Sequence, residues 1–164
     1  RPEMEPYAQD VVREYPGRAE VWMKAFGTRD GPAVFYDTSR QALTELFGLG
    51  ATTAMDKRTG ELDYAAPRTV EMVDASRVIE ELSGNNAVVI LKLDIEGSEF
   101  DVLEHLLATG VASRLAGLIV DWHEQHFDES QREALAERRR QIETALLRQG
   151  IKYRAAHVMS VDGR

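Results

Sequence analysis

Two kinds of hydrophobic pattern alternate along this chain. Residues 88–93 and 115–121 are apolar runs rich in branched side chains, typical of strands buried on both faces of a parallel sheet. Apolar residues recur at helical spacing after the first run, up to Gly110, and after the second run between Ser130 and Gly150. A strand, a helix and a second strand in succession predict a right-handed crossover between parallel neighbours, and therefore an α/β fold.

The remaining elements are expected to be shorter or less regular. Helices are predicted at residues 3–15 and 75–82, and strands at residues 19–23, 33–36, 69–72 and 153–158. Residues 38–66 form a long connection with a short helix near 41–47, which is either a functional lid or a mobile surface excursion. No internal repeat or low-complexity tract divides the chain, so residues 1–164 are interpreted as a single domain.

Polar side chains that can bind ligands or transfer protons follow both apolar runs. Asp94 and Glu96 come directly after the first run, and Asp121 and His123 come at the end of the second. Because the carboxyl ends of neighbouring parallel strands meet at one edge of a sheet, where open α/β sheets bind ligands, we expect these side chains to form a site. Such a group orients a substrate hydroxyl, takes its proton, or holds a cation.

A structural interpretation competes with each of these roles. Three polar residues open the next helix and are explained equally well by capping and by the helix dipole: Ser98, Glu99 and Asp101. Capping explains Asp94 and Glu96 poorly, so a functional role is favoured there. Histidine titrates near neutrality, so His123 is a candidate general base, although a histidine making ordinary hydrogen bonds is almost as frequent. Lys92 lies inside the strand and is expected to pair with an acid.

Other catalytic classes fit the sequence less well. The segment from His123 to His126 is one residue short of the helical zinc motif His-Glu-x-x-His, and the acidic turn after residue 93 does not suit a phosphate. The run Arg138-Arg139-Arg140 lies among glutamates and is interpreted as a solvated helix face.

Composition narrows the partners. The chain has 20 Lys and Arg against 28 Asp and Glu, a net charge of −8, which argues against a nucleic-acid or anionic-membrane surface. The absence of cysteine excludes disulfides, thiolate metal sites and cysteine nucleophiles. With no visible signal peptide or spanning apolar stretch, a cytoplasmic protein is the default expectation. The chain starts at Arg1 rather than Met, so a removed leader is compatible with it.

Three segments resemble one known family. Residues 92–99, Lys-Leu-Asp-Ile-Glu-Gly-Ser-Glu, resemble the Lys-x-Asp-x-Glu-Gly-x-Glu signature of FkbM-type methyltransferases. Residues 118–123 resemble the family's next strand, which ends in an acid followed closely by histidine, and residues 25–31 resemble its turn with Asp-Gly. The resemblance covers most of residues 1–160. It implies a class I, Rossmann-like sheet, mostly parallel with helices on both faces, and methylation of a hydroxyl on a small molecule or sugar.

The resemblance also implies roles for individual residues. S-adenosylmethionine is the implied cofactor, and the residues that end the third strand of class I enzymes, here Ala25 and Phe26, lie near its adenine ring. The end of the fourth strand, with Asp94 and Glu96, lies near the reactive methyl group and the acceptor. Asp94, Glu96 and His123 are therefore the candidates for positioning and proton removal, with Asp94 also near the cofactor. No metal ligand is assigned.

One departure from the family leaves alternatives open. The family begins with a strand and a glycine-rich cofactor loop that nothing in this chain supplies, and two strands should separate residues 19–24 from 88–93. We therefore expect a C-terminal portion of a longer protein, and residues 161–163 resemble a turn into a further strand. One alternative is a non-catalytic fragment. Another is a divalent-metal enzyme using Asp94, Glu96, Asp121 and His123. Neither the acceptor nor the oligomeric state is predicted.

Overall fold

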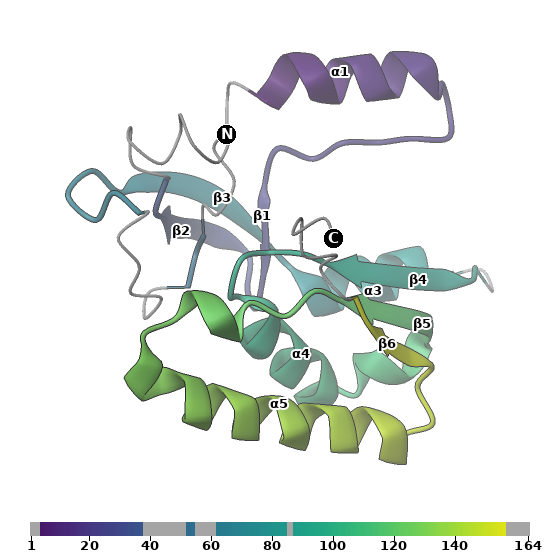
Figure 1. Cartoon of the computed structure of the whole chain (residues 1–164). Helices are drawn as coiled ribbons and strands as arrows, with labels where there is room; N and C mark the ends of the chain where they lie inside the picture. The colour runs from purple at the N-terminus through teal and green to yellow at the C-terminus, as the bar shows by residue number, and fades with distance from the viewer. Residues whose placement is uncertain (1–3, 38–51, 55–61, 85–86, 157–164) are drawn as a thin grey trace, which may run out of the picture.

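The computed structural model describes residues 4–37, 52–54, 62–84 and 87–156, which form an α/β fold (Figure 1). Within these ranges the helices and strands follow the chain in this order: α1 Glu5–Glu14, β1 Ala25–Gly27, β2 Gly31–Phe35, β3 Arg68–Asp74, α3 Ala75–Leu82, β4 Val89–Leu93, α4 Glu99–Ala108, the short 3-10 helix η3 Val111–Arg114, β5 Leu115–Val120, the 3-10 helix η4 Glu124–His126, α5 Glu129–Arg148 and β6 Tyr153–Ala155. The strands form one sheet in the order β1-β3-β2 and another in the order β4-β5-β6.

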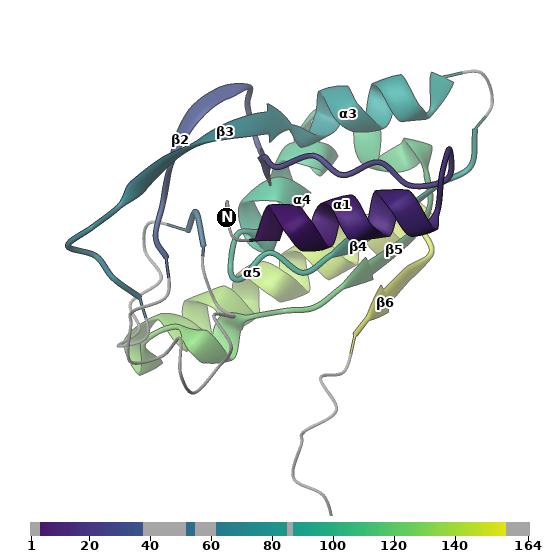
Figure 2. The ribbon, with the colours of Figure 1, turned by 90° about the horizontal axis from the view of Figure 1, so that it is seen from above.

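The β4-β5-β6 sheet is parallel throughout and carries the predicted crossover. β4 pairs with β5, with Leu93 opposite Val120, and α4 makes the connection between them. Figure 1 shows α4 and α5 on one side of this sheet and α1 on the other, and the view from above in Figure 2 agrees. The predicted α/β class, with a mostly parallel sheet and helices, is therefore confirmed.

Only one face of β4 is buried by the described part of the chain. Leu93 is buried, whereas Ile90 and Lys92, which alternate with the inward residues, are exposed. The uniform apolar run in the sequence therefore does not reflect burial on both faces within these residues. α1 contributes little to the core, because none of its residues is buried.

The β1-β3-β2 sheet corrects one expectation. β1 runs parallel to β3, with Phe26 opposite Val73, and β2 runs antiparallel to β3. The strand expected at residues 19–23 begins instead at Ala25, the first residue of this segment that pairs with β3. β1 and β4 lie in two different sheets, whereas the resemblance implies one sheet; that they are not paired with each other matches the expected strand order. That a longer protein supplies a glycine-rich loop stays a prediction.

The helices at residues 3–15, 75–82 and 130–150 form close to where their spacing predicts them. α3 begins at Ala75 because the Asp74 carboxylate accepts hydrogen bonds from the N–H groups of Ser76 at 2.7 Å and Arg77 at 3.3 Å. The same carboxylate lies 2.9 Å from Nε2 of His105 on α4, so the cap also links two helices. The short helix predicted near 41–47 and the turn at 161–163 lie outside the described residues.

The arginine run of α5 is not a simple solvated face. Arg138 pairs with Glu104 and Asp101 of α4, at 2.5 Å and 2.6 Å, and its guanidinium lies 5.5 Å from the centre of the Phe100 ring. Arg140 is the exposed member, 63% accessible. Arg138 therefore joins α5 to α4 over the buried core, which the sequence interpretation missed because it depends on which helix face meets α4.

Candidate functional site

A tight turn at the end of β4 places the acidic side chains of the site. After Leu93 the chain turns through Glu96, whose φ is +57°, and Gly97, whose φ is +104°. The left-handed region is unfavourable for a residue with a side chain, so Glu96 carries local strain. Glycine is needed at position 97 for space as well, since a Cβ there would lie 2.9 Å from the Phe127 ring.

Glu99 holds this turn in place from the first turn of α4. Its side chain is completely buried. Its Oε1 accepts the N–H of Ile95 at 2.8 Å, and its Oε2 accepts the N–H of Gly97 at 2.9 Å. Nδ1 of His123 lies 2.9 Å from the same Oε1. Glu99 therefore joins the turn after β4 to the segment after β5, a larger role than the helix capping considered from the sequence.

The other residues at the start of α4 are also not simple caps. The Ser98 hydroxyl makes no capping bond and instead lies 2.8 Å from the Thr53 hydroxyl. Asp101 pairs with Arg138. The capping role considered for Ser98 is therefore wrong, and the turn depends on Glu99 instead.

The His123 ring has Nδ1 toward Glu99 and Nε2 toward Asp94 and Glu96. Its side chain is only 7% exposed. A carboxylate only accepts hydrogen bonds, so a neutral His123 donates its Nδ1–H to Glu99 and directs the Nε2 lone pair outward. Nε2 lies 3.8 Å from Oδ1 of Asp94 and 3.7 Å from Oε2 of Glu96. The predicted gathering of Asp94, Glu96 and His123 is thus confirmed, while their catalytic roles stay predictions.

Asp94 is anchored on its other side and remains accessible. Its Oδ2 accepts a hydrogen bond from Nζ of Lys92 at 2.8 Å, and this bond together with the carboxylate charge raises the pKa of Lys92. The expected pairing of Lys92 with an acid is confirmed. Asp121 follows β5 at the same sheet edge, where its N–H bonds to the carbonyl of Leu93 at 2.9 Å. Its carboxylate is not part of the group formed by Asp94, Glu96 and His123.

Ala25 and Phe26 lie elsewhere in the fold, on β1 of the other sheet. Phe26 is partly buried and packs against the main core. Their expected position near an adenine ring stays a prediction.

A second buried network supports the segment after β5 and was missed from the sequence. Nε1 of Trp122 donates to the Tyr153 hydroxyl at 2.7 Å, and that hydroxyl donates to Glu143 at 2.7 Å. Burial, together with the neighbouring Glu143, raises the pKa of Tyr153 to about 12. Arg139 lies 5.2 Å from the centre of the Trp122 ring and bonds Glu143 at 2.9 Å. These contacts fix Trp122, the residue that precedes His123, and no local sequence pattern predicts them.

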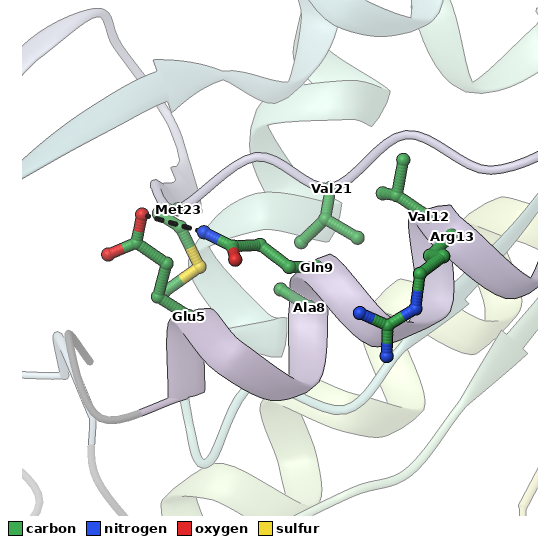
Figure 3. Close-up of a pocket in the computed structure, with 7 residues that line it drawn as sticks. All are labelled: Glu5, Ala8, Gln9, Val12, Arg13, Val21 and Met23. Carbon is green, nitrogen blue, oxygen red and sulfur yellow. Dashed lines mark hydrogen bonds between the residues drawn. The ribbon is translucent and has the colours of Figure 1, made fainter. Parts of the chain in front are cut away.

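A separate cavity of about 340 Å³ lies between α1 and the extended segment before β1 (Figure 3). Its lining is apolar at Ala8, Val12, Val21 and Met23 and polar at Glu5, Gln9 and Arg13. Figure 3 shows the Gln9 amide directed at Glu5, with Nε2 donating to Oε1 at 3.4 Å. None of the three residues at the sheet edge lines this cavity. The two carboxylates and the imidazole that face one another lie at the sheet edge, so the candidate site is placed there.

Comparison with known proteins identifies the family of this chain. The profile of the methyltransferase FkbM domain matches residues 20–153, which include both strand ends and the whole candidate site. A search among curated proteins found no significant match, and neither did a search among solved structures. No helix in the described residues combines the length and apolar character needed to cross a membrane. The profile matches well over half of the 164 residues of this chain, and the chain therefore belongs to the FkbM methyltransferase family.

Proposed function

We propose that this domain transfers a methyl group from S-adenosylmethionine to a hydroxyl oxygen of a small molecule, with sugars as the first acceptors to test. Membership of the FkbM methyltransferase family supports methyl transfer in general. The observation that carries the proposal is the position of His123 Nε2 beside Asp94 and Glu96 at the carboxyl edge of the sheet. Open α/β sheets bind their ligands at this edge.

The side chains at the sheet edge suit both the methyl donor and the hydroxyl acceptor. S-adenosylmethionine, when bound, supplies a methyl group that leaves its sulfonium as the oxygen–carbon bond forms. Asp94 and Glu96 are 44% and 22% exposed, so a ligand reaches them, and their negative charge favours a cationic sulfonium nearby. Ala25 and Phe26 are proposed to contact the adenine ring, on the family resemblance alone.

Removal of the hydroxyl proton falls to His123 in this proposal. Nε2 takes the proton while Glu99 keeps the ring in place through Nδ1. The imidazolium that forms is stabilised by the Glu99 carboxylate and by the two acids beyond Nε2. Asp94 and Glu96 in turn orient the hydroxyl, because an oriented acceptor supplies much of the acceleration in a displacement reaction.

The test uses the protein, labelled S-adenosylmethionine and a panel of hydroxylated acceptors. Substituting Asp94→Asn or His123→Ala should lower kcat about 10²–10⁴-fold. Glu80→Gln, on the exposed face of α3, is the matched control and should leave the rate unchanged. A wild-type rate in His123→Ala would remove this residue as the base. Absence of S-adenosylhomocysteine binding in calorimetry would support the non-catalytic alternative.

A further inference from the structure

We infer that Asp94, Glu96 and His123 form a binding site for one divalent metal ion with mixed oxygen and nitrogen ligands. A bound ion would take the Nε2 lone pair of His123, so in the ion-bound protein the acceptor hydroxyl would bind the ion, which lowers its pKa, and would lose its proton to solvent instead of to Nε2. The ion's role rests on the methyl transfer proposed above. Its presence does not, because metal binding is measured without cofactor or acceptor. The three side chains each present one ligand atom to a common space, and those atoms all lie within 4.8 Å of one another.

The separations between the ligand atoms suit a shared ion better than direct hydrogen bonds. Nε2 of His123 lies 3.8 Å from Oδ1 of Asp94 and 3.7 Å from Oε2 of Glu96, both longer than a hydrogen bond. A point equidistant from three atoms spaced in this way lies about 2.2–2.5 Å from each, within the range of divalent metal–ligand bonds. The spacing of these three atoms therefore fits a single divalent ion.

The imidazole is prepared as a ligand by residues that do not touch the ion. Metal-binding histidines almost always donate their other ring N–H to a carboxylate or a carbonyl, which fixes the tautomer and the ring orientation. Glu99 fulfils this role for His123 at 2.9 Å, and two backbone N–H groups hold the Glu99 carboxylate in turn. The ring itself is only 7% exposed, so its direction is fixed by packing as well.

The ligand types select among metals. Carboxylates suit Mg²⁺, Ca²⁺ and Mn²⁺, whereas imidazole suits Zn²⁺ and other late transition metals, so Mn²⁺ and Zn²⁺ are the ions to test on this mixed set. Three protein ligands leave coordination positions open for water or for a substrate oxygen, and the 44% exposure of Asp94 leaves a path from solvent. Asp121, which the sequence placed in the ligand set, does not belong to this cluster.

The experiment is a Mn²⁺ titration of tag-free, chelator-treated protein followed by electron paramagnetic resonance of the free ion, with Zn²⁺ as competitor. We expect one saturable site. Asp94→Asn should raise its Kd at least tenfold, and this half-exposed residue is replaced with little risk to the fold. His123→Gln should do the same, and Glu80→Gln should match the wild type.

Two results would overturn the metal site: no saturable Mn²⁺ or Zn²⁺ binding by the wild type, or wild-type affinity in Asp94→Asn. Methyl transfer that proceeds unchanged after chelator treatment overturns the ion's role in the reaction while leaving the binding site and the proposed function standing. Saturable binding that Asp94→Asn abolishes supports the site even if no methyl transfer is detected, so the two proposals fail separately.

Discussion

Replacing Glu99 with glutamine tests the buried network under the site. A carboxylate offers only acceptors, and here both oxygens accept: Oε1 from Ile95 and from His123, and Oε2 from Gly97. A glutamine side chain keeps one acceptor oxygen and puts an NH₂ group, a donor, in place of the other. In Glu99→Gln at least one buried N–H therefore faces another donor, whichever way the amide turns.

The magnitude follows from the number of bonds lost. With the amide oxygen toward Ile95 and His123, only the N–H of Gly97 loses its acceptor, whereas the reverse orientation strands both other donors. A buried donor without an acceptor costs about 1–3 kcal/mol, and a neutral acceptor weakens the bond from His123 by roughly 1 kcal/mol more. We expect the free energy of unfolding to fall by about 2–4 kcal/mol, which leaves a domain of ordinary stability folded.

Urea unfolding followed by circular dichroism measures this loss. Asp101→Asn is the matched control, a carboxylate-to-amide change in the same helical turn on a side chain that is 60% exposed, and it should cost less than about 1 kcal/mol. In methyl transfer, Glu99→Gln should lower kcat about 10²–10⁴-fold with little change in KM, since the ring loses its orientation but no substrate contact is removed. Equal stability of the two variants would refute the network's energetic role, and an unchanged kcat would refute positioning.

Three further outcomes are expected. Burial alone would raise the pKa of Asp74, but hydrogen bonds from His105 and from two backbone N–H groups hold it below its usual value. A carboxyl group whose pKa is lowered by folding stabilises the folded state at pH values above its unfolded-state pKa, near 4, and this stabilisation is lost as the pH falls through the folded-state pKa. In Asp74→Asn the free energy of unfolding should therefore depend less on pH in the acidic range. Gly97→Ala should cost about 1–3 kcal/mol in thermal unfolding, because φ is +104° and a Cβ meets the Phe127 ring; a wild-type melting temperature would contradict this. Arg138→Gln should lower the free energy of unfolding in urea by about 1–2 kcal/mol, because partly exposed ion pairs and the contact with an aromatic face are lost. An unchanged free energy of unfolding would mean that these ion pairs do not stabilise the fold.

The sequence predicts the main sheet and the place of the site well, because both follow from local patterns and one topological rule. The helical spacing of α3 and α5 and the apolar runs of β4 and β5 can be recognised within single windows. Parallel neighbours joined by a crossover must bring their carboxyl ends together, and this rule alone is enough to expect Asp94 and His123 at one edge of the sheet.

What could not be predicted depends on partners distant in the sequence. The apolar residues 21–23 have the composition of a strand, yet pairing with β3 begins only at Ala25, and no local pattern marks that position. Glu99 looks like any acid in the first turn of a helix, and only the fold shows that it reaches His123, 24 residues away. Arg138 belongs to a charged run that looks solvent-exposed in the sequence, but in the fold it pairs with Glu104 because one face of α5 packs against α4.

The bonds from Glu99 to the backbone make two amide hydrogens natural reporters of the site. The N–H groups of Ile95 and Gly97 belong to no helix or strand, so their exchange with solvent deuterium is governed by how long the Glu99 carboxylate stays in place. Any ligand that restrains His123 also restrains that carboxylate from the opposite side. Slower exchange at these two amides would therefore register occupancy of the site by cofactor, acceptor or metal, without an activity assay and without knowledge of the substrate.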